Sequence, residues 1–438
     1  MRLPANNLRI ISAIERFLAQ ESAGGLLLFG SAALAMALAN SGLSQGYSEF
    51  WQTYAGFNVG SFELKMSLGH WINDGLMAIF FLVIGLEIKR ELMVGELSSL
   101  SKAAFPVVAA LGGMLAPALI YLTLNLGGSG DPSGFGIPMA TDIAFALGFL
   151  MLLGKRVPLA LKVFLVSLAV IDDLGAITVI AIFYSGSLDW PSLIWAVGII
   201  AALIGLNRFG IKTLTPYLLL GLLLWYFVYQ SGIHPTIAGV VLALTIPVRQ
   251  KISSDSFADT CQLGLEAFGK AEQKRKSILI SSEQQDTLEK IGEACVHVQS
   301  PLVRLEHALH PVSAFLIMPV FALANAGVAI GGGSLSLLQP VSLGIILGLF
   351  IGKPLGIVGL SFIASKLGWV TKPASVNWRY LIGASLLGGV GFTMSIFISQ
   401  LAFTDSDIIA TAKLAILLTS LTAGLCGVIY LSRYLERS

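Results

Sequence analysis

Two adjacent carboxylates in the middle of an apolar stretch constrain this chain more than any other feature. Residues 161–184 read LKVFLVSLAVIDDLGAITVIAIFY, and Asp172 and Asp173 lie near the centre. About 20 predominantly apolar residues cross the hydrocarbon core of a bilayer as a helix. An ionisable group at that depth costs at least ~2.5–3.5 kcal/mol, so it usually faces a cavity and serves an ion or proton pathway. The pair therefore predicts a buried ionic site inside a transmembrane helix.

Composition places the whole chain in the membrane. The 438 residues are 55% hydrophobic and 12% charged, whereas soluble domains carry roughly 25% charged residues. The three cysteines show no metal-ligand spacing and no disulfide framework. We expect an all-α polytopic membrane protein without a cofactor or a nucleic-acid partner. Its twelve predicted apolar segments are 12–40, 68–88, 103–125, 136–154, 161–184, 190–206, 213–229, 233–247, 306–329, 341–364, 380–402 and 408–432.

The distribution of basic residues predicts the orientation of these segments. With twelve spans and a cytoplasmic N-terminus, 16 of the 27 Lys and Arg residues fall in short loops and termini on one side, and loop 249–305 adds eight more there. The opposite side receives only Lys65 and Lys413. Because cytoplasmic loops carry an excess of Lys and Arg, both termini are expected in the cytoplasm. One integral membrane domain follows, with eight spans in residues 1–248, a cytoplasmic polar loop at 249–305 and four spans in 306–438.

Two segments outside the spans have their own character. Loop 249–305 carries eight acidic residues against its eight basic ones, which favours a partly helical, mobile segment; a solvated loop and a regulatory contact both fit it. The external segment 54–66, YAGFNVGSFELKM, predicts a short β-hairpin around Gly60–Ser61. An isolated hairpin is marginally stable in water, so we expect this one to pack on something, such as a second subunit.

Two further charged residues lie deep in predicted spans. Asp142 follows the sequence GFGIPMAT, and Lys353 lies within LFIGKPLGIVGL. Three buried carboxylates against one ammonium leave capacity for a cation or for protons, and pairing lowers the cost of burial for both signs. Asp142 is either a site residue or a packing residue. Lys353 is either a structural partner of a carboxylate or itself a proton carrier.

Two of the spans are predicted to be interrupted. Glycines and a proline precede Thr141–Asp142 in the fourth span, and three glycines precede Thr393 in LLGGVGFTMSIFI of the eleventh span. Unwound backbone at membrane depth is tolerated where it lines a cavity or is buried in protein. Interrupted helices at corresponding positions of two halves indicate a transporter site built on inverted repeats.

Several charged residues at span ends admit two interpretations. GLEIKREL ends the second span, and RLEHALHP opens the ninth. Each is either an ion-paired helix end or a pH-sensitive cluster, because His titrates near neutral pH. His234, in SGIHPTIAG, is either structural or a ligand.

The chain resembles the NhaA-type bacterial sodium/proton antiporters. The matching stretches include HWINDGLMAIFFLVIGLEIKREL, IPMATDIAFALG, LAVIDDLGAI, SGIHPTIAG, RLEHALHP, MPVFALANAG, IGKPLGI and GVGFTMSIFI, in the order of the family. The resemblance implies a fold with inverted repeats and two discontinuous helices that cross in mid-membrane. It also implies a homodimer through the hairpin near 54–66 and a location in the bacterial inner membrane. Loop 249–305 is longer than the corresponding loop of the family.

The resemblance also assigns roles to residues. Asp172 and Asp173 match the aspartates that bind the cation, Na⁺ or Li⁺, and the proton. Thr141 and Asp142 match the polar residues at the crossing of the broken helices. Lys353 matches the lysine that pairs with an aspartate and, with Asp142, balances the charges of the helix ends. Asp74 matches an acidic residue of the second span. The residues that match the pH-responsive groups are Glu87, Arg90, Glu91, Glu306, His307, His310 and His234.

The predicted activity is an electrogenic, pH-regulated exchange of cytoplasmic Na⁺ or Li⁺ for external H⁺, which extrudes sodium and maintains pH. Carboxylates, a hydroxyl and carbonyls suit a hard cation, and protonation removes the charge that holds it. One rival is a sodium-coupled symporter of an organic solute, which needs further substrate-specific polar groups. The other is an intramembrane aspartyl protease, for which the expected GxGD sequence is absent.

Overall fold

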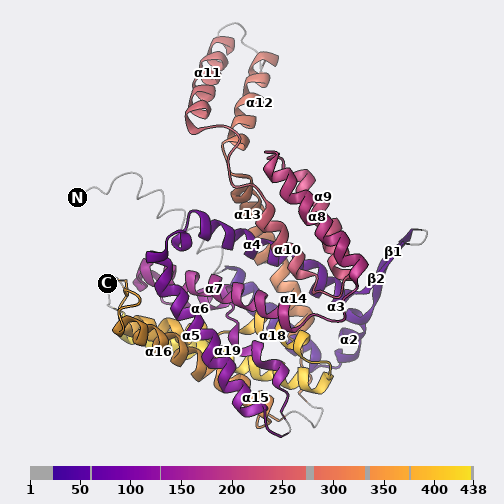
Figure 1. Cartoon of the computed structure of the whole chain (residues 1–438), viewed down its shortest axis with the longest axis vertical. Helices are drawn as coiled ribbons and strands as arrows, with labels where there is room; N and C mark the ends of the chain where they lie inside the picture. The colour runs from indigo at the N-terminus through magenta and orange to yellow at the C-terminus, as the bar shows by residue number, and fades with distance from the viewer. Residues whose placement is uncertain are drawn as a thin grey trace.

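The structure is an all-α bundle from which two hairpins project (Figure 1). This computed structural model describes residues 23–59, 62–128, 130–272, 281–330, 336–373 and 376–435. The predicted N-terminal charges at Arg2, Arg9 and Arg16, and the Gly60–Ser61 turn, lie outside these residues. The rest of the predicted hairpin is present as strands β1 (Tyr54–Val59) and β2 (Phe62–Ser67). The two strands pair antiparallel, with Tyr54 opposite Ser67.

The first half of the chain supplies the helices that surround the aspartate pair. A helix at Ala23–Ala39 precedes the hairpin. The other elements of this half are α2 (Ser44–Gln52), α3 (Leu68–His70), η1 (Trp71–Leu76), α4 (Met77–Met93), η2 (Glu96–Ser98), α5 (Leu100–Asn125), η3 (Pro132–Met139), α6 (Ile143–Met151), η4 (Gly154–Arg156), α7 (Leu159–Phe183), α8 (Trp190–Arg208), α9 (Leu214–Gln230) and α10 (Thr236–Thr245). The segments α3, η1 and α4 are continuous and form one span, Leu68–Met93.

The second half begins with a polar helical hairpin and returns to the membrane. Its elements are α11 (Ser254–Glu272), α12 (Ser282–His297), α13 (Pro301–Val312), η5 (Ser313–Ile317), α14 (Met318–Asn325), α15 (Pro340–Leu347), η6 (Gly348–Gly352), α16 (Lys353–Lys366), α17 (Trp378–Gly388), α18 (Phe392–Ala402) and α19 (Ser406–Tyr434). The segments α13, η5 and α14 form one span, and so do α15, η6 and α16. The ninth span begins at Pro301, five residues before its predicted start at 306.

The helices confirm a polytopic membrane protein. Among the described residues, eight are long and apolar enough to cross a bilayer, or up to ten if each of two bent pairs counts as one span. The helices α9 and α10 are apolar but shorter. Only 17% of the apolar window of α8 is buried, and its Ile194 is 70% exposed. A helix that is apolar on its outward face is suited to lipid and not to water.

A close helix crossing positions Lys353. A Cβ added to Gly112 of α5 would lie 2.1 Å from the carbonyl oxygen of Gly356 in α16, and one added to Gly356 would lie 1.9 Å from that of Gly112. Both positions therefore require glycine, because any side chain would force the helices apart. Since Lys353 is the first residue of α16, this contact places its side chain in the interior of the bundle.

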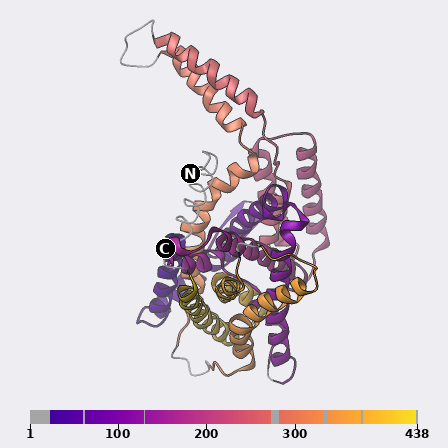
Figure 2. The same ribbon diagram turned by 90° about the vertical axis from the view of Figure 1, so that its left-hand side faces the viewer.

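Most of the predicted polar loop is helical. Figure 2 shows α11 and α12 as an antiparallel pair that projects from the membrane bundle. The start of α12 is encoded locally by a capping box, in which Ser281 and Gln284 bond to each other's backbone N–H groups. At the base of the pair, the N–H of Lys251 donates to the carbonyl of His297 at 2.9 Å.

Candidate functional site

Two interrupted helices meet at their breaks. In the first, η3 ends at Met139 and α6 begins at Ile143, so Ala140–Asp142 are extended. In the second, α17 ends at Gly388 and α18 begins at Phe392, with a bend of 46°. The N–H of Asp142 donates to the carbonyl of Val390 at 2.7 Å, which joins the two breaks directly. The interruptions predicted from glycine and proline are thus present in both segments.

The carboxylate of Asp142 caps two helices at once. Its Oδ1 accepts the N–H of Phe145 in α6 at 3.0 Å, and its Oδ2 accepts the N–H of Thr393 in α18 at 3.1 Å. The hydroxyl of Thr393 also bonds to Oδ2. A carboxylate satisfies the free N–H groups at a helix start and opposes the positive end of the helix dipole. Thr393 is not among the site residues predicted from the sequence; its position in the first turn of the helix after the glycines is the signal that indicates a site role.

Lys353 pairs with Asp172. Its Nζ lies 2.5 Å from Oδ2 of Asp172 and 2.5 Å from Oγ1 of Thr141, and the side chains of Lys353 and Asp172 are 0% exposed. Oγ1 of Thr141 also lies 2.8 Å from Oδ2 of Asp172 and 2.9 Å from the carbonyl oxygen of Gly388. A hydroxyl has one proton, so it donates to one of these oxygens at a time. Thr141 therefore links the ion pair to the C-terminal end of α17.

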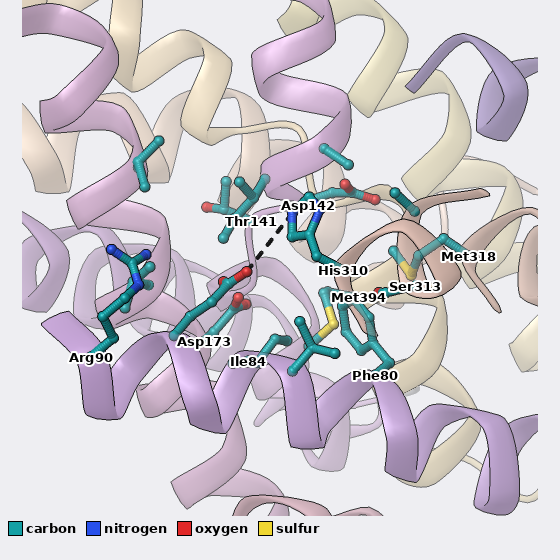
Figure 3. A pocket seen from close by; sticks show the side chains of 17 residues that line it. Phe80, Ile84, Arg90, Thr141, Asp142, Asp173, His310, Ser313, Met318 and Met394 are labelled. Carbon is teal, nitrogen blue, oxygen red and sulfur yellow. Dashed lines mark ion pairs between the residues drawn. The ribbon is translucent and has the colours of Figure 1, made fainter. Parts of the chain in front are cut away.

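Asp173 points elsewhere, into a cavity (Figure 3). Successive residues of a helix point about 100° apart, so neighbours on α7 serve different surroundings. The cavity is bounded by α4, the start of α6, α7, α13, η5 and the first residues of α14 and α18. Its polar lining residues include Thr141, Asp142 and Asp173, together with Glu87 and Arg90 of α4 and His310 of α13. The cavity therefore connects the aspartates with the charged ends of α4 and α13.

The aspartate pair retains unused acceptor oxygens. Among the described residues, Oδ1 of Asp172 and Oδ1 of Asp173 are buried without a hydrogen-bond partner. A buried acceptor oxygen without a hydrogen bond destabilises a protein, so most such oxygens have a partner. Oxygen ligands of this kind suit a hard cation or a proton.

The predicted pH-responsive residues form one network with two outliers. Nε of Arg90 donates to both carboxylate oxygens of Glu306, at 3.0 and 3.1 Å, and its guanidinium also bonds to Glu91 at 3.0 Å. Nε2 of His310 lies 4.0 Å from Oε1 of Glu87, the contact dashed in Figure 3. The structure thus brings together residues of α4 and α13. His307, beside Glu306, is exposed.

His234 lies apart from that network. Its Nε2 is 3.6 Å from Oδ1 of Asp74, which belongs to η1, and its Nδ1 is 2.8 Å from Oγ1 of Thr236. Both Asp74 and His234 belong to the opposite end of the bundle from the Arg90–Glu306 pair, since Asp74 is at the start and Arg90 near the end of the same span.

Comparison with known proteins agrees with this architecture. Residues 15–431 match the family described as Na⁺/H⁺ antiporter 1. Proteins named Na(+)/H(+) antiporter NhaA from Wolinella succinogenes and from Helicobacter pylori are each 54% identical to the chain. The first aligns over 95% of this chain and 92% of the relative, and the second over 95% and 94%. A protein named Na(+)/H(+) antiporter NhaA 2 from Helicobacter hepaticus is 49% identical over 98% of this chain and 97% of that protein. The chain therefore belongs to the Na⁺/H⁺ antiporter 1 family of multi-pass membrane proteins.

Proposed function

We propose that this protein exchanges Na⁺ or Li⁺ for H⁺ at Asp172 and Asp173. The observation that carries the proposal is the meeting of two interrupted helices at a cavity into which Asp173 points, with Asp172 held beside it by Lys353. Membership of the Na⁺/H⁺ antiporter 1 family and the names of its relatives, Na(+)/H(+) antiporters, support it. The transported ions are the ligands that the proposal requires.

Competition for the same oxygens explains the exchange. Asp173, with Thr141 and Asp142 in the lining of the same cavity, supplies oxygen ligands for a dehydrated cation. A proton on Asp173 removes the charge that attracts the cation, so the site releases one ion as it takes the other. Protonation of the buried pair is a property of both carboxylates together, since they are adjacent.

The orientation follows from charge. We place both termini and the α11–α12 pair in the cytoplasm of a bacterium and the β-hairpin outside, because Lys and Arg concentrate on the former side. The cavity then opens toward the cytoplasm, past Glu87, Arg90 and His310. If more proton charge enters than cation charge leaves, the membrane potential contributes ~2.3 kcal/mol per charge per 100 mV. Exchange of this kind removes sodium from the cell and maintains its pH.

The network at the mouth of the cavity is proposed to set the pH response. Protonation of His310 adds a positive charge opposite Glu87. The added positive charge changes the electrostatic potential in the cavity through which a cation is proposed to reach Asp173. Asp74 and His234 are proposed to contribute from the external side.

The β-hairpin is proposed to form a dimer contact. Gly56 lies so close to the partner strand that an added Cβ would be 2.1 Å from the carbonyl oxygen of Leu64. The strands are therefore tightly paired; among the described residues the sheet consists of these two strands, so each has an outer edge along which a second copy could pair.

The test is a sodium-driven pH change in proteoliposomes. Asp173→Asn should abolish the change, because amide nitrogen and oxygen neither titrate nor carry the charge. Asp189→Asn is the matched control: Asp189 is the exposed cap of α8, accepting the N–H of Ser192 at 3.0 Å, and asparagine caps a helix equally well. Sodium-driven proton movement of normal size in Asp173→Asn would refute the site.

A further inference from the structure

Three spans each contribute one phenylalanine to a buried aromatic layer. Phe81 of α4, Phe321 of α14 and Phe397 of α18 are at most 1% exposed. The Phe397 ring centroid lies 5.5 Å from that of Phe81 and 6.2 Å from that of Phe321. The ring of His234 also contacts this layer: its centroid lies 5.3 Å from that of Phe397, and the two rings are nearly perpendicular.

The same three spans each contribute one amide to a closed ring of hydrogen bonds. Nδ2 of Asn73 donates to Oε1 of Gln400 at 2.9 Å, the amide of Gln400 donates to Oδ1 of Asn325, and Nδ2 of Asn325 donates to Oδ1 of Asn73 at 2.9 Å. Each amide therefore donates once and accepts once within the ring. Asn73 belongs to η1, a π-helical segment, and such segments often occur at functional sites.

The cavity lining, the phenylalanines and the amides follow one another in the same order along two of the three spans, those that end in α14 and α18. The cavity at Asp173 ends at Phe80, Met318 and Met394, which belong to the same three spans as the phenylalanines and the amides. Along α14, Met318, Phe321 and Asn325 follow one another on one face, and along α18 the order is Met394, Phe397 and Gln400. At 1.5 Å per residue, six or seven residues span roughly 9–10 Å. In the span Leu68–Met93, Phe80 and Phe81 are adjacent, so there the cavity floor and the aromatic layer lie at one level, with Asn73 beyond them. The amide ring thus lies beyond the cavity floor and the aromatic layer, toward the end of the bundle that carries the β-hairpin.

We propose that the second access route to the aspartates runs between α4, α14 and α18, and that the phenylalanine layer and the amide ring form the gate that closes it. The inference rests on the proposed exchange function, which requires access from both sides. The composition of the gate suits reversible opening. Phenylalanine rings exclude hydrated ions, and amides that separate can exchange their mutual hydrogen bonds for bonds to water at little cost. A purely apolar contact would lack that exchange.

Accessibility of a cysteine in the cavity tests the gate without reference to transport. Val83 of α4 lines the cavity and is 3% exposed. In a background with Cys261, Cys295 and Cys426 replaced by serine, Val83→Cys is treated from the hairpin side with a small cationic thiol reagent that does not cross membranes. Adding Gln400→Leu should raise the labelling rate by about tenfold, because two ring hydrogen bonds are lost, together worth about 1.4 kcal/mol.

The control for that substitution is Gln230→Leu. Gln230 is exposed at the end of α9, on the same side of the bundle, and within the described part of the chain its amide bonds locally, to Tyr226 at 2.8 Å. The Gln230→Leu substitution should leave the labelling rate of Val83→Cys unchanged. A rate in Gln400→Leu within twofold of the parent would overturn the gate even where sodium-driven proton movement is intact. A tenfold rise in a protein that shows no sodium-driven proton movement would support the gate and refute the exchange function alone.

Cross-linking supplies the complementary test. Asn73→Cys with Gln400→Cys, bridged by Hg²⁺ in the same serine background, should lose exchange at least tenfold and regain it when a thiol removes the metal. The pair Tyr226→Cys and Gln230→Cys, within one helix, should bind Hg²⁺ with no loss. Exchange that continues at the unbridged rate, or a pair that does not bridge, would overturn the gate.

Discussion

Replacing Lys353 by alanine should destabilise the protein more than any other single lysine substitution in its membrane bundle. Nζ of Lys353 lies 2.5 Å from Oδ2 of Asp172, and both side chains are completely buried. Removing one partner of a buried ion pair costs about 3–5 kcal/mol, because the remaining charge keeps its desolvation penalty without its partner. Thr141 would also lose the ammonium as a donor.

The reasoning predicts a recovery as well as a loss. Replacing a buried pair by apolar residues of similar volume is often neutral or stabilising, so Lys353→Met combined with Asp172→Leu should melt close to the parent although it cannot exchange ions. The two single effects should therefore fail to add.

Melting in detergent at one fixed scan rate measures these effects. Lys366→Ala is the control, because Lys366 belongs to the same helix but is exposed, with a cation–π contact to Phe362 at 5.3 Å. Such a contact is worth about 0.5–1 kcal/mol. The buried pair would be refuted as the source of stability if Lys353→Ala had the same melting temperature as Lys366→Ala. It would also be refuted if the double variant melted at as low a temperature as Lys353→Ala.

Three further outcomes are expected. Asp142→Ala should lower stability by about 2 kcal/mol, ~1 for each helix start that it caps, whereas Asp142→Asn should keep most of it in the same melting assay. Exchange should rise from mildly acidic to alkaline pH, and His310→Gln should move the midpoint because its contact with Glu87 then no longer titrates; an unmoved midpoint in a pH series of the vesicle assay would leave competition at the aspartates as the whole cause. Replacing residues 253–298 by a short Gly/Ser linker should leave exchange measurable, since a flexible linker can join the helix ends; an inserted and folded protein without exchange at any pH would contradict this.

The sequence is sufficient to predict the architecture of the site, but not the rotation of α7 that decides which way each aspartate points. Glycines and Pro138 before Thr141, and three glycines before Thr393, predict the two interruptions, and the structure has both. The sequence also predicts a carboxylate partner for Lys353, but it does not specify which of the three buried aspartates that is. The stretch around Asp172 and Asp173 is apolar on every side, so no periodicity fixes which residue faces α16 and which faces the cavity. Packing of α5 against α16 makes that choice.

Interactions between distant spans were the least predictable. Asn73, Asn325 and Gln400 are separated by 252 and 75 positions, and a lone amide at a span end is an unremarkable residue. Their ring is visible only when three spans are brought together. In contrast, α12 could have been predicted from its local capping sequence at Ser281, because a capping box is a contact between residues three apart.

The charges at the two breaks explain why Asp173 is the carboxylate best suited to exchange its ligand. Asp142 opposes two positive helix starts, and Lys353 opposes both Asp172 and, through Thr141, the negative end of α17. These fixed charges balance one another within the protein. Among the described residues, Asp173 has no ion pair, and it faces the cavity. A cation or a proton that enters the cavity is therefore the counter-charge that this carboxylate lacks, and binding either one does not require the Asp142 and Lys353 contacts to break.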